Sequence, residues 1–358
     1  LMRLNRPAAA EKQFERAIAS DERNGTYHLW LGRAIGQQAA TASVLRQPFM
    51  ARRIRSEFER AVALDPELID ARDGLIQFYL MAPAVSTPPG QAMRVPGGYR
   101  LTAQWKWGSG VMHSDWAMGQ AMCEVDGKPA MHWMAFPLRE ARVLDTWYVQ
   151  GLAATGSNDI VVNDLFIPEH MAVRSSDMGN GTTPGSKVHA NPMYRMPSSA
   201  FLGLVTSAPA IGAARGAVNL FREKLKTRKV LGTQSILSEK PNYQVMLARA
   251  DVMVRMAELQ HLDCARHVYE LARKDQVHDI GARMAIVAQN SYATRVARDA
   301  VRLIVDNAGS SVHLLTDPLQ RISRDVNVVC GHVIQDFETL AEQHGRSLLG
   351  LPPITYMF

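Results

Sequence analysis

One long segment, residues 241–274, repeats small and apolar side chains at alternating spacings of three and four residues. The repeating positions are Leu247, Ala250, Val254, Ala257, His261, Cys264, Val268 and Leu271. Such a stripe covers one face of an α-helix, which must pack against other helices to be buried. Comparable patterns near residues 198–226, 281–308 and 317–344 therefore predict an antiparallel four-helix bundle. In the last of these segments the stripe consists of Leu319, Ile322, Val326, Val329 and Val333.

A shorter segment ahead of the bundle alternates with a period of two. Its bulky or apolar positions are Tyr99, Leu101, Ala103, Trp105 and Trp107. Residues with this period lie on one face of a β-strand, so we expect all five to be buried. Strand-like runs follow at residues 115–124, 130–138, 142–150 and 159–167. Several short strands separated by turns predict a small antiparallel β barrel or sandwich, and the fold class is therefore α+β.

Residues 1–84 contain an internal repeat. Phe14-Glu-Arg-Ala-Ile-Ala-Ser-Asp21 recurs as Phe58-Glu-Arg-Ala-Val-Ala-Leu-Asp65. The repeat resembles tetratricopeptide repeats, although their usual period of about 34 residues is shorter. It predicts helix-turn-helix units with a concave face that could bind a protein partner.

A change of composition separates this repeat from the strands. Pro, Gly, Ser and Thr are concentrated between Ala82 and Gly98, and such residues mark a boundary. We therefore divide the chain into helical repeats at 1–84, a β domain at 85–190 and a C-terminal four-helix bundle at 191–358.

Composition excludes several classes of function. Lys plus Arg number 40 and Asp plus Glu 34, which gives a net charge of +6 without any long run of like charge. We therefore expect neither nucleic-acid binding nor a polybasic membrane surface. The least polar window, Ala200–Ala214, is shorter than the ~20 residues that a membrane span needs. The three cysteines lie far apart, so they predict no disulfide framework and no metal site, and they favour a reducing, cytoplasmic compartment.

Ordered motifs in the last two regions point to one family. They are Gly98–Gly110, Leu144–Asp159, Phe166–Glu169, Ala208–Ala217, Asp317–Arg321, Arg324-Asp325, His332 and Leu348–Pro352. Together they resemble the acyl-CoA dehydrogenase superfamily and, more narrowly, the oxygenase components of two-component flavin monooxygenases. The resemblance covers residues 84–358. It implies that a separate flavin reductase supplies reduced FMN or FAD, which reacts with O2 to give a C4a-hydroperoxide that hydroxylates a small aromatic, phenol-like substrate.

The same resemblance implies catalytic residues. Ser109 matches a serine that hydrogen-bonds near flavin N5, with the backbone of Trp107 and Gly108 beside the ring. His332 matches a histidine near C4a, and we expect it on the last helix of the bundle. An imidazole suits this position because it donates or accepts a proton near neutral pH. The alternative interpretations are a tight turn at Gly108–Gly110 and a packed core histidine at 332.

Further residues match the flavin and substrate sites of the family. Ser310 and Ser311 match a turn that touches the flavin, and Arg228 matches an arginine that binds its phosphate. Arg228 could equally be one more charge on a solvated helix end. Arg195 could reach a substrate carboxylate. The loop Ala154–Asn158 is interpreted only as a turn, and relatives form tetramers through the bundle.

Two other functions stay open at this stage. Acyl-CoA dehydrogenation by an FAD enzyme would need a carboxylate base, and no motif nominates one. A catalytically impaired flavoprotein remnant fused to a repeat interaction module would bind no flavin. Residues 1–84 do not match the N-terminal domain of the relatives, so they either cover the active site or leave it open. Because the chain begins with Leu1, we expect a fragment or an incomplete gene product.

Overall fold

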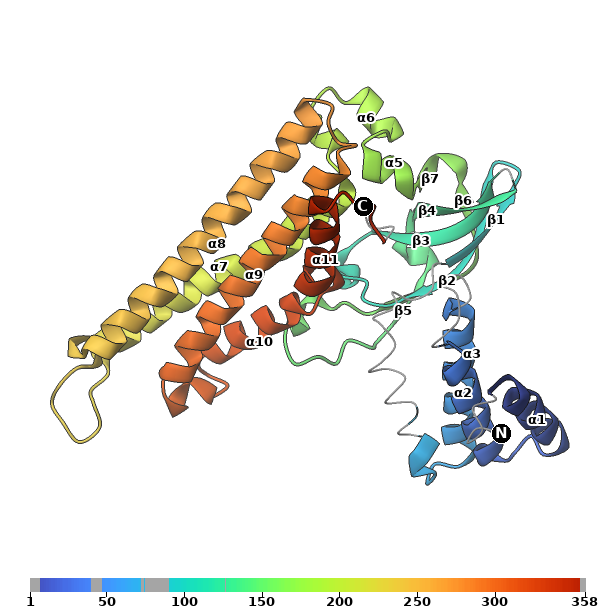
Figure 1. Ribbon diagram of the computed structural model, residues 1–358, viewed down its shortest axis with the longest axis horizontal. Helices are drawn as coiled ribbons and strands as arrows, with labels where there is room; N and C mark the ends of the chain where they lie inside the picture. The colour runs from blue at the N-terminus through green and yellow to red at the C-terminus, as the bar shows by residue number, and fades with distance from the viewer. Residues whose placement is uncertain (1–6, 40–46, 72–73, 75–89, 126, 355–358) are drawn as a thin grey trace. The chain divides into compact units, whose positions relative to one another are not determined.

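The computed structural model describes residues 7–39, 47–71, 74, 90–125 and 127–354 (Figure 1). The chain divides into two compact units, Leu1–Pro88 and Pro89–Phe358. The β-sheet and the C-terminal helices both belong to the second unit. Residues 82–89 of the expected boundary segment lie outside the described residues.

The first unit is helical, as the repeat predicts. Its described helices are α1 (Pro7–Ser20), α2 (Gly25–Ala39) and α3 (Gln47–Leu64). Phe58, an aromatic residue of the repeat, is buried between α2 and α3 together with Ile35 and Ile54. A Cβ atom on Gly32 would lie only 2.9 Å from the Phe58 ring, so the glycine allows the two helices to approach closely. The other repeat phenylalanine, Phe14, stacks on Trp30.

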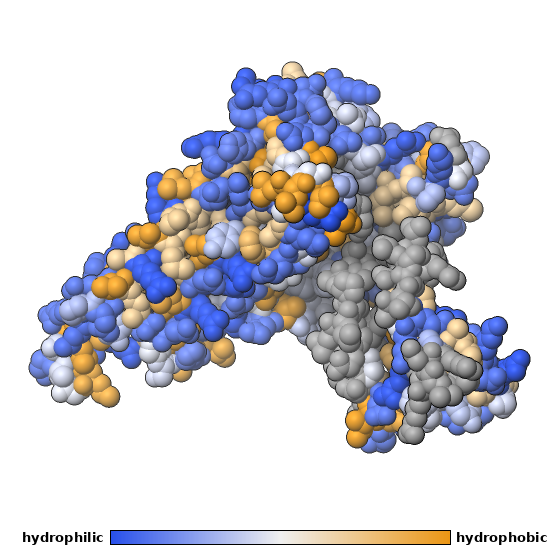
Figure 2. All heavy atoms as spheres, in the orientation of Figure 1, coloured by the Kyte–Doolittle hydropathy of each residue, from blue (hydrophilic) through white to orange (hydrophobic). Residues whose placement is uncertain are grey.

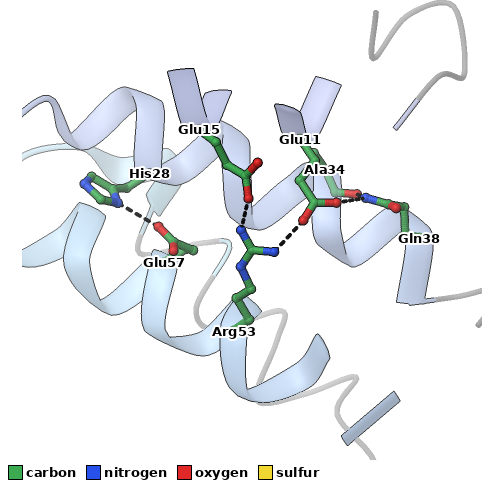
Figure 3. Close-up of polar contacts among 7 residues, drawn as sticks. All are labelled: Glu11, Glu15, His28, Ala34, Gln38, Arg53 and Glu57. Carbon is green, nitrogen blue, oxygen red and sulfur yellow. Dashed lines mark hydrogen bonds and ion pairs between the residues drawn. The ribbon is translucent and has the colours of Figure 1, made fainter. Parts of the chain in front are cut away.

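Polar side chains connect these three helices (Figure 3). Arg53 of α3 pairs with Glu11 and Glu15 of α1, and His28 of α2 lies 2.7 Å from Glu57 of α3. Exposed ion pairs contribute little stability individually, typically about 0–1 kcal/mol. The buried contacts around Phe58 therefore contribute more to the stability of this unit than the partly exposed Arg53 pairs do.

The second unit begins with one seven-stranded sheet. Its strands are β1 (Gly90–Val95), β2 (Gly98–Trp105), β3 (Trp116–Val125), β4 (Lys128–Pro137), β5 (Arg142–Leu144), β6 (Asp159–Pro168) and β7 (Ala172–Arg174). Their order across the sheet is β5-β6-β2-β1-β3-β4-β7, and every pair is antiparallel except β1 with β3. The prediction of an all-antiparallel sheet is therefore wrong for this central pair. Within the described ranges β5 and β7 are the edges, so the strand pairing does not close a barrel.

The strands differ from the prediction at three places. The sequence pattern missed β1, which lies in the segment that we interpreted as a boundary, and it missed the short β7. The run predicted at 142–150 is a strand only to Leu144. Strands β1 and β7 are short, and β1 is flanked by the Pro and Gly residues that otherwise mark loops. The local composition around β1 therefore predicted a linker. The segment is a strand because it pairs with β2 and β3.

Strand β2 buries its apolar face as the alternation predicts, with one exception. Tyr99, Leu101 and Ala103 are buried, and Trp105 stacks on Phe136 with ring centroids 5.6 Å apart. Trp107 is 51% exposed, because the chain leaves the strand before it and the residue adopts a left-handed backbone with φ of 61°. The expectation that all five residues share one buried face is therefore wrong at its last member.

Three of the four predicted long helices form within a residue or two of their expected bounds. The helices of this region are α7 (Ser198–Thr227), α8 (Pro241–Arg273), α9 (Ile280–Asn307), α10 (Pro318–Cys330) and α11 (Phe337–Leu348), preceded by the short α5 (Ser175–Asn180) and α6 (Pro184–Val188). Figure 1 shows α7, α8 and α9 lying side by side, and their small buried residues form the core. By length and composition α7 could cross a membrane, but its buried face belongs to this core.

The fourth predicted helix is in fact two helices. α10 ends at Cys330, a 3-10 turn (η9, Val333–Gln335) follows, and α11 begins at Phe337. His332 caps the turn, because its Nδ1 accepts a hydrogen bond from the Ile334 N–H at 3.2 Å. Val333, which the periodicity assigned to the buried stripe, is consequently 49% exposed.

Gly119 of β3 provides a test of how the sheet is packed. A Cβ atom there would lie 2.4 Å from Cε2 of Trp105, and that indole is fixed by its stacking on Phe136. We expect Gly119→Ala to lower the free energy of unfolding by about 1–3 kcal/mol, as overpacking does. Urea unfolding followed by circular dichroism measures this change. The control is Gly212→Ala, where a Cβ meets nothing within 4 Å; equal stability of the two variants would contradict the packing described.

Candidate functional site

A cavity of about 650 Å³ lies between loops of the sheet and helix α10. Its lining residues are Ser109, Gly110, His113, Gln150, Gly151, Leu152, Ala153, Ala154, Thr155, Arg321, Arg324 and Asp325. One wall is apolar and consists of Leu152, Ala153 and Ala154. The other sides carry hydroxyl, imidazole, guanidinium and carboxylate groups. This combination of an apolar wall and a few polar groups is typical of a small-molecule site.

The backbone around the cavity is held in uncommon conformations. Trp107 and Leu152 are non-glycine residues with left-handed backbones, at φ of 61° and 56°. Such conformations cost about 1–3 kcal/mol each and persist only where the surroundings fix them. Both backbone polar groups of Leu152 are hydrogen-bonded to side chains. Its N–H donates to Asp325 Oδ1 at 2.6 Å, and its carbonyl accepts from Trp147 Nε1 at 3.0 Å. Strain maintained in this way is concentrated at functional sites in proteins.

The same contacts join the sheet loop to the bundle. Arg324 of α10 donates to the carbonyl of Gln150, and Asp325 accepts from Leu152. A Cβ atom on Gly151 would lie 2.5 Å from the Arg324 carbonyl oxygen, so only glycine fits at this close approach. The Arg324-Asp325 motif therefore attaches the loop to α10.

A chain of hydroxyl groups runs from the interior to the cavity wall. Ser157 Oγ is 3.0 Å from Ser109 Oγ and 2.8 Å from Thr155 Oγ1. Ser157 itself is only 3% exposed, and the Gly108 N–H donates to the Asn158 carbonyl at 2.9 Å. The sequence interpretation assigned Ser157 to a turn and missed its contact with Ser109. The hydroxyl-rich Thr155-Gly156-Ser157 triplet was the available signal.

His332 lies in the connection between α10 and α11, and it is not among the lining residues of the cavity. His332 is an exposed residue, yet the protein atoms around its imidazole lower the pKa of the ring through desolvation. Nδ1 accepts a backbone hydrogen bond, so the neutral ring carries its proton on Nε2. The direction of the pKa change and the hydrogen bond agree, because both favour the neutral form.

The remaining predicted flavin residues form a second group. Arg228 directly follows α7, and its guanidinium donates to the Ala308 carbonyl and covers Gly309. Ser310 and Ser311 begin the 3-10 turn that follows Gly309. The structure thus brings Arg228 to the Ser310–Ser311 turn, but none of the three lines the cavity beside Ser109.

Arg195 ends a 3-10 turn, Pro192–Arg195, and does not line the cavity either. Its backbone packs tightly on Gly181, where a Cβ atom would lie 2.3 Å from the Arg195 carbonyl oxygen. This contact is structural, and the role of the guanidinium stays a prediction.

The cysteines form neither a disulfide nor part of a three-residue metal cluster in the described part of the chain. All three are free, and no cluster of three or more His, Cys, Asp or Glu side chains is placed to bind a metal among the described residues. Burial raises the pKa of Cys330 to about 11, so this thiol is protonated at neutral pH.

Comparison with known proteins identifies the family. The family model described as acyl-CoA dehydrogenase, C-terminal domain, matches residues 204–337. A pigment production hydroxylase from Rhodococcus sp. (strain ATCC 21145) is 34% identical over 275 residues, which cover 76% of this chain and 70% of that protein. The FADH(2)-dependent resorcinol hydroxylase, oxygenase component, from Rhizobium sp. (strain MTP-10005) is 28% identical over 277 residues, covering 74% and 68%.

A solved structure extends the likeness in fold. XiaF from Streptomyces sp., in complex with FADH2 and glycerol, matches with a TM-score of 0.67 at 24% identity, over 99% of each chain. A match of this extent includes the helices of the first unit. The resemblance of residues 1–84 to tetratricopeptide repeats receives no support from these comparisons.

Asp325 provides a test of the contact between loop and helix. We expect Asp325→Ala to lower the free energy of unfolding by about 1.5–3 kcal/mol, because the Leu152 N–H loses a charged acceptor. The Leu152 amide should then exchange with solvent about ten-fold faster or more, which hydrogen exchange measures. Asp325→Asn keeps an acceptor oxygen and should show a smaller effect on both. Unchanged exchange at Leu152 in Asp325→Ala would contradict the assigned contact.

Proposed function

Because this chain belongs to the flavin-dependent monooxygenases of the acyl-CoA dehydrogenase fold, as an oxygenase component, we propose that it hydroxylates a small phenol-like substrate. The co-substrates are O2 and a reduced flavin, FMN or FAD, which a separate flavin reductase delivers. The observation that carries the proposal is the cavity beside Ser109, set between the sheet and α10 in a chain 34% identical to a hydroxylase.

The cavity fits the ring system of a flavin. Its volume of about 650 Å³ lies in the range of about 300–1,000 Å³ that small-molecule sites occupy. The apolar wall at Leu152–Ala154 suits the face of an aromatic ring, and the hydroxyls of Ser109 and Thr155 suit its polar edge. Gly108 keeps the chain close to Ile160, since a Cβ atom there would lie 2.7 Å from Cδ1 of that residue. A bound reduced flavin supplies the electrons that activate O2.

Within this proposal Ser109 has a defined task. Its hydroxyl is held by Ser157 Oγ, which is in turn held by Thr155, so it is oriented before any ligand binds. An oriented hydroxyl can hydrogen-bond a ring nitrogen such as N5 without reorganising at the moment of reaction. We assign the backbone of Trp107 and Gly108 to the edge of the ring, which it would contact when flavin is bound. The hydroxyl that joins Ser109 and Thr155, that of Ser157, is buried and shielded from water.

We assign His332 as a hydrogen-bond donor, in the tautomer that its contact with Ile334 implies. Because Nδ1 accepts the Ile334 N–H, Nε2 is the nitrogen left to contact a ligand, and in the neutral ring Nε2 carries the proton. We therefore assign His332 to stabilising the reacting oxygen by donation from Nε2. Removal of a phenol proton by this nitrogen would first require the other tautomer.

The second group of residues serves the rest of the flavin in this proposal. The guanidinium of Arg228 is exposed, and a planar group with five N–H donors can pair with two phosphate oxygens. Ser310 and Ser311, beside it, are assigned to the same part of the ligand. Arg195 is assigned to a carboxylate on the substrate.

We also propose that the enzyme works as a homo-oligomer, a tetramer, in the reducing cytoplasm where its three free thiols persist. One observation supports self-association. Helix α8 exposes an apolar stripe, whose residues are Val245, Val252, Met256, Leu259 and Leu262, each between 49% and 68% exposed. Figure 2 shows hydrophobic side chains on the exposed surface of the long helices. Apolar surface of this kind is typical of protein contacts.

The catalytic assignment is tested by coupling measurements. Chemically reduced FMN or FAD is mixed with aerated buffer, the protein and a panel of phenols, and hydroxylated product and hydrogen peroxide are both quantified. We expect His332→Gln to lower product per reduced flavin by about 100-fold, the lower end for loss of one oriented hydrogen-bond donor at a reacting oxygen, and to raise peroxide release. Ser109→Ala should behave similarly but less severely.

The control for this experiment is His267→Gln, an exposed histidine on α8, which should match the parent. Equal product yield from the parent and His332→Gln would overturn the role of His332. Absence of hydroxylated product from the parent with both flavins and every phenol would overturn the proposed function.

The oligomer is tested separately by light scattering after size-exclusion chromatography. Leu259→Glu places a charge in the apolar stripe of α8, and we expect it to reduce the measured mass to that of a smaller assembly, since burying an unpaired carboxylate is unfavourable. Leu231→Glu makes the same change at a loop residue that is 99% exposed, and it should leave the mass unchanged. A monomeric parent would refute the tetramer.

A further inference from the structure

Gln335 is a buried amide that uses all of its hydrogen-bonding groups. It lies at the end of the η9 turn, three residues after His332, and is 4% exposed. Its Nε2 donates to the Gly203 carbonyl at 2.8 Å and to Thr206 Oγ1 at 2.7 Å, both on α7. Its Oε1 accepts from Thr294 Oγ1 of α9 at 3.1 Å. One side chain therefore connects the turn to two helices of the bundle.

The backbone of the turn is held in the same way. The Gln335 carbonyl accepts from Ser291 Oγ of α9 at 2.7 Å, and the Gln335 N–H donates to the His332 carbonyl at 2.7 Å. Between these two residues, the Ile334 N–H donates to His332 Nδ1. The atoms that fix the imidazole and the atoms that fix Gln335 thus belong to one turn of four residues.

Helix α7 is irregular in the segment that carries these acceptors. Pro209 has no N–H, so the carbonyl four residues before it lacks its usual partner. Thr206 Oγ1 and Ser207 Oγ donate back to carbonyls of the preceding turn, which loosens a helix. The Gly203 carbonyl receives both Gln335 Nε2 and Asn290 Nδ2, the latter at 3.0 Å.

The contacts continue into the core of the bundle. Asn290 Oδ1 lies 2.9 Å from His261 Nδ1 and 3.2 Å from Ser207 Oγ. Ser207, Asn290 and Thr294 are all almost completely buried. Buried polar networks in which every group is satisfied make a structure rigid and specify one arrangement. The η9 turn is anchored to such a network, although His332, the residue that caps it, is exposed.

We propose that Gln335 is a positioning residue, which holds the η9 turn on α7 and α9 and thereby keeps the His332 imidazole in one orientation and one tautomer. The proposal rests on the proposed function for its relevance to catalysis. It predicts that Gln335 affects the reaction only through His332, since its own side chain is buried between helices.

The test replaces Gln335 by Met, which keeps the length and removes the hydrogen bonds. The other members keep partners in this variant: Gly203 still accepts from Asn290, Thr206 Oγ1 donates to the Leu202 carbonyl, and Thr294 Oγ1 donates to the Asn290 carbonyl. The variant is therefore expected to fold. The matched control is Gln343→Met, another buried glutamine, which bonds the Ile354 N–H.

Two measurements on the full chain are compared. The first is the pair of ¹⁵N shifts of the His332 ring in protein labelled with ¹⁵N-histidine, assigned among its 11 histidines with the help of His332→Gln. The second is product formed per reduced flavin consumed. In Gln335→Met we expect the ring to change from a single Nε2–H tautomer to a mixture, and the product yield to fall about three-fold or more. Gln343→Met should change neither.

The outcomes separate this proposal from the function on which it rests. A Gln335→Met protein with a single Nε2–H tautomer overturns it, and so does a mixed tautomer with unchanged product yield in an active enzyme. If the parent hydroxylates no phenol, the proposed function fails while the ¹⁵N shifts still decide whether Gln335 fixes the ring. If Gln335→Met does not fold, Thr294→Val, which removes only the donor to Oε1, is judged by the same two measurements.

Discussion

The hydrogen bond between Leu152 and Asp325 joins the two layers of the second unit, the sheet and the helical bundle. Leu152 belongs to a loop of the sheet and Asp325 to helix α10, and the bond holds the leucine in a left-handed backbone that it would not adopt alone. With Gly151 packed on Arg324, it brings the sheet and the bundle together at one place. The cavity lies beside this contact, because Leu152 of the loop and Asp325 of the helix both line it. Binding chemistry here is a consequence of how two layers are joined.

Periodicity predicted most of the second unit, because its elements bury one face each. The seam of α8 and the alternation of β2 were correct at nearly every residue, since a repeating stripe reports burial directly. The pattern failed where burial stops being periodic. Trp107 continues the alternation in sequence but turns outward at a positive φ, and Val333 continues the helical stripe but follows the end of α10. Both failures lie next to residues assigned to the flavin.

The candidate site was predictable as a set of residues but not as an arrangement. Resemblance nominated Ser109 and His332, and the structure sets one of them in the cavity wall and the other in a turn between helices. Ser157 was missed, because a serine in a Gly-containing loop is usually explained by the turn alone. The contacts of Gln335 were also out of reach, because they join segments more than 40 residues apart in the chain. Such contacts depend on tertiary packing, which local patterns do not describe.

The position of β1 limits how the gene for such a chain can be rearranged. Although β1 is the first strand of its unit, it lies in the middle of the sheet, between β2 and its parallel neighbour β3. Gly90 at its start is already packed, with a Cβ position 2.6 Å from the side chain of Ala103. If recombination replaced β1 with unrelated sequence, the sheet would lose the strand that joins β2 to β3 and would divide into two parts. Any exchange of the preceding segment during evolution must therefore have its junction ahead of this strand.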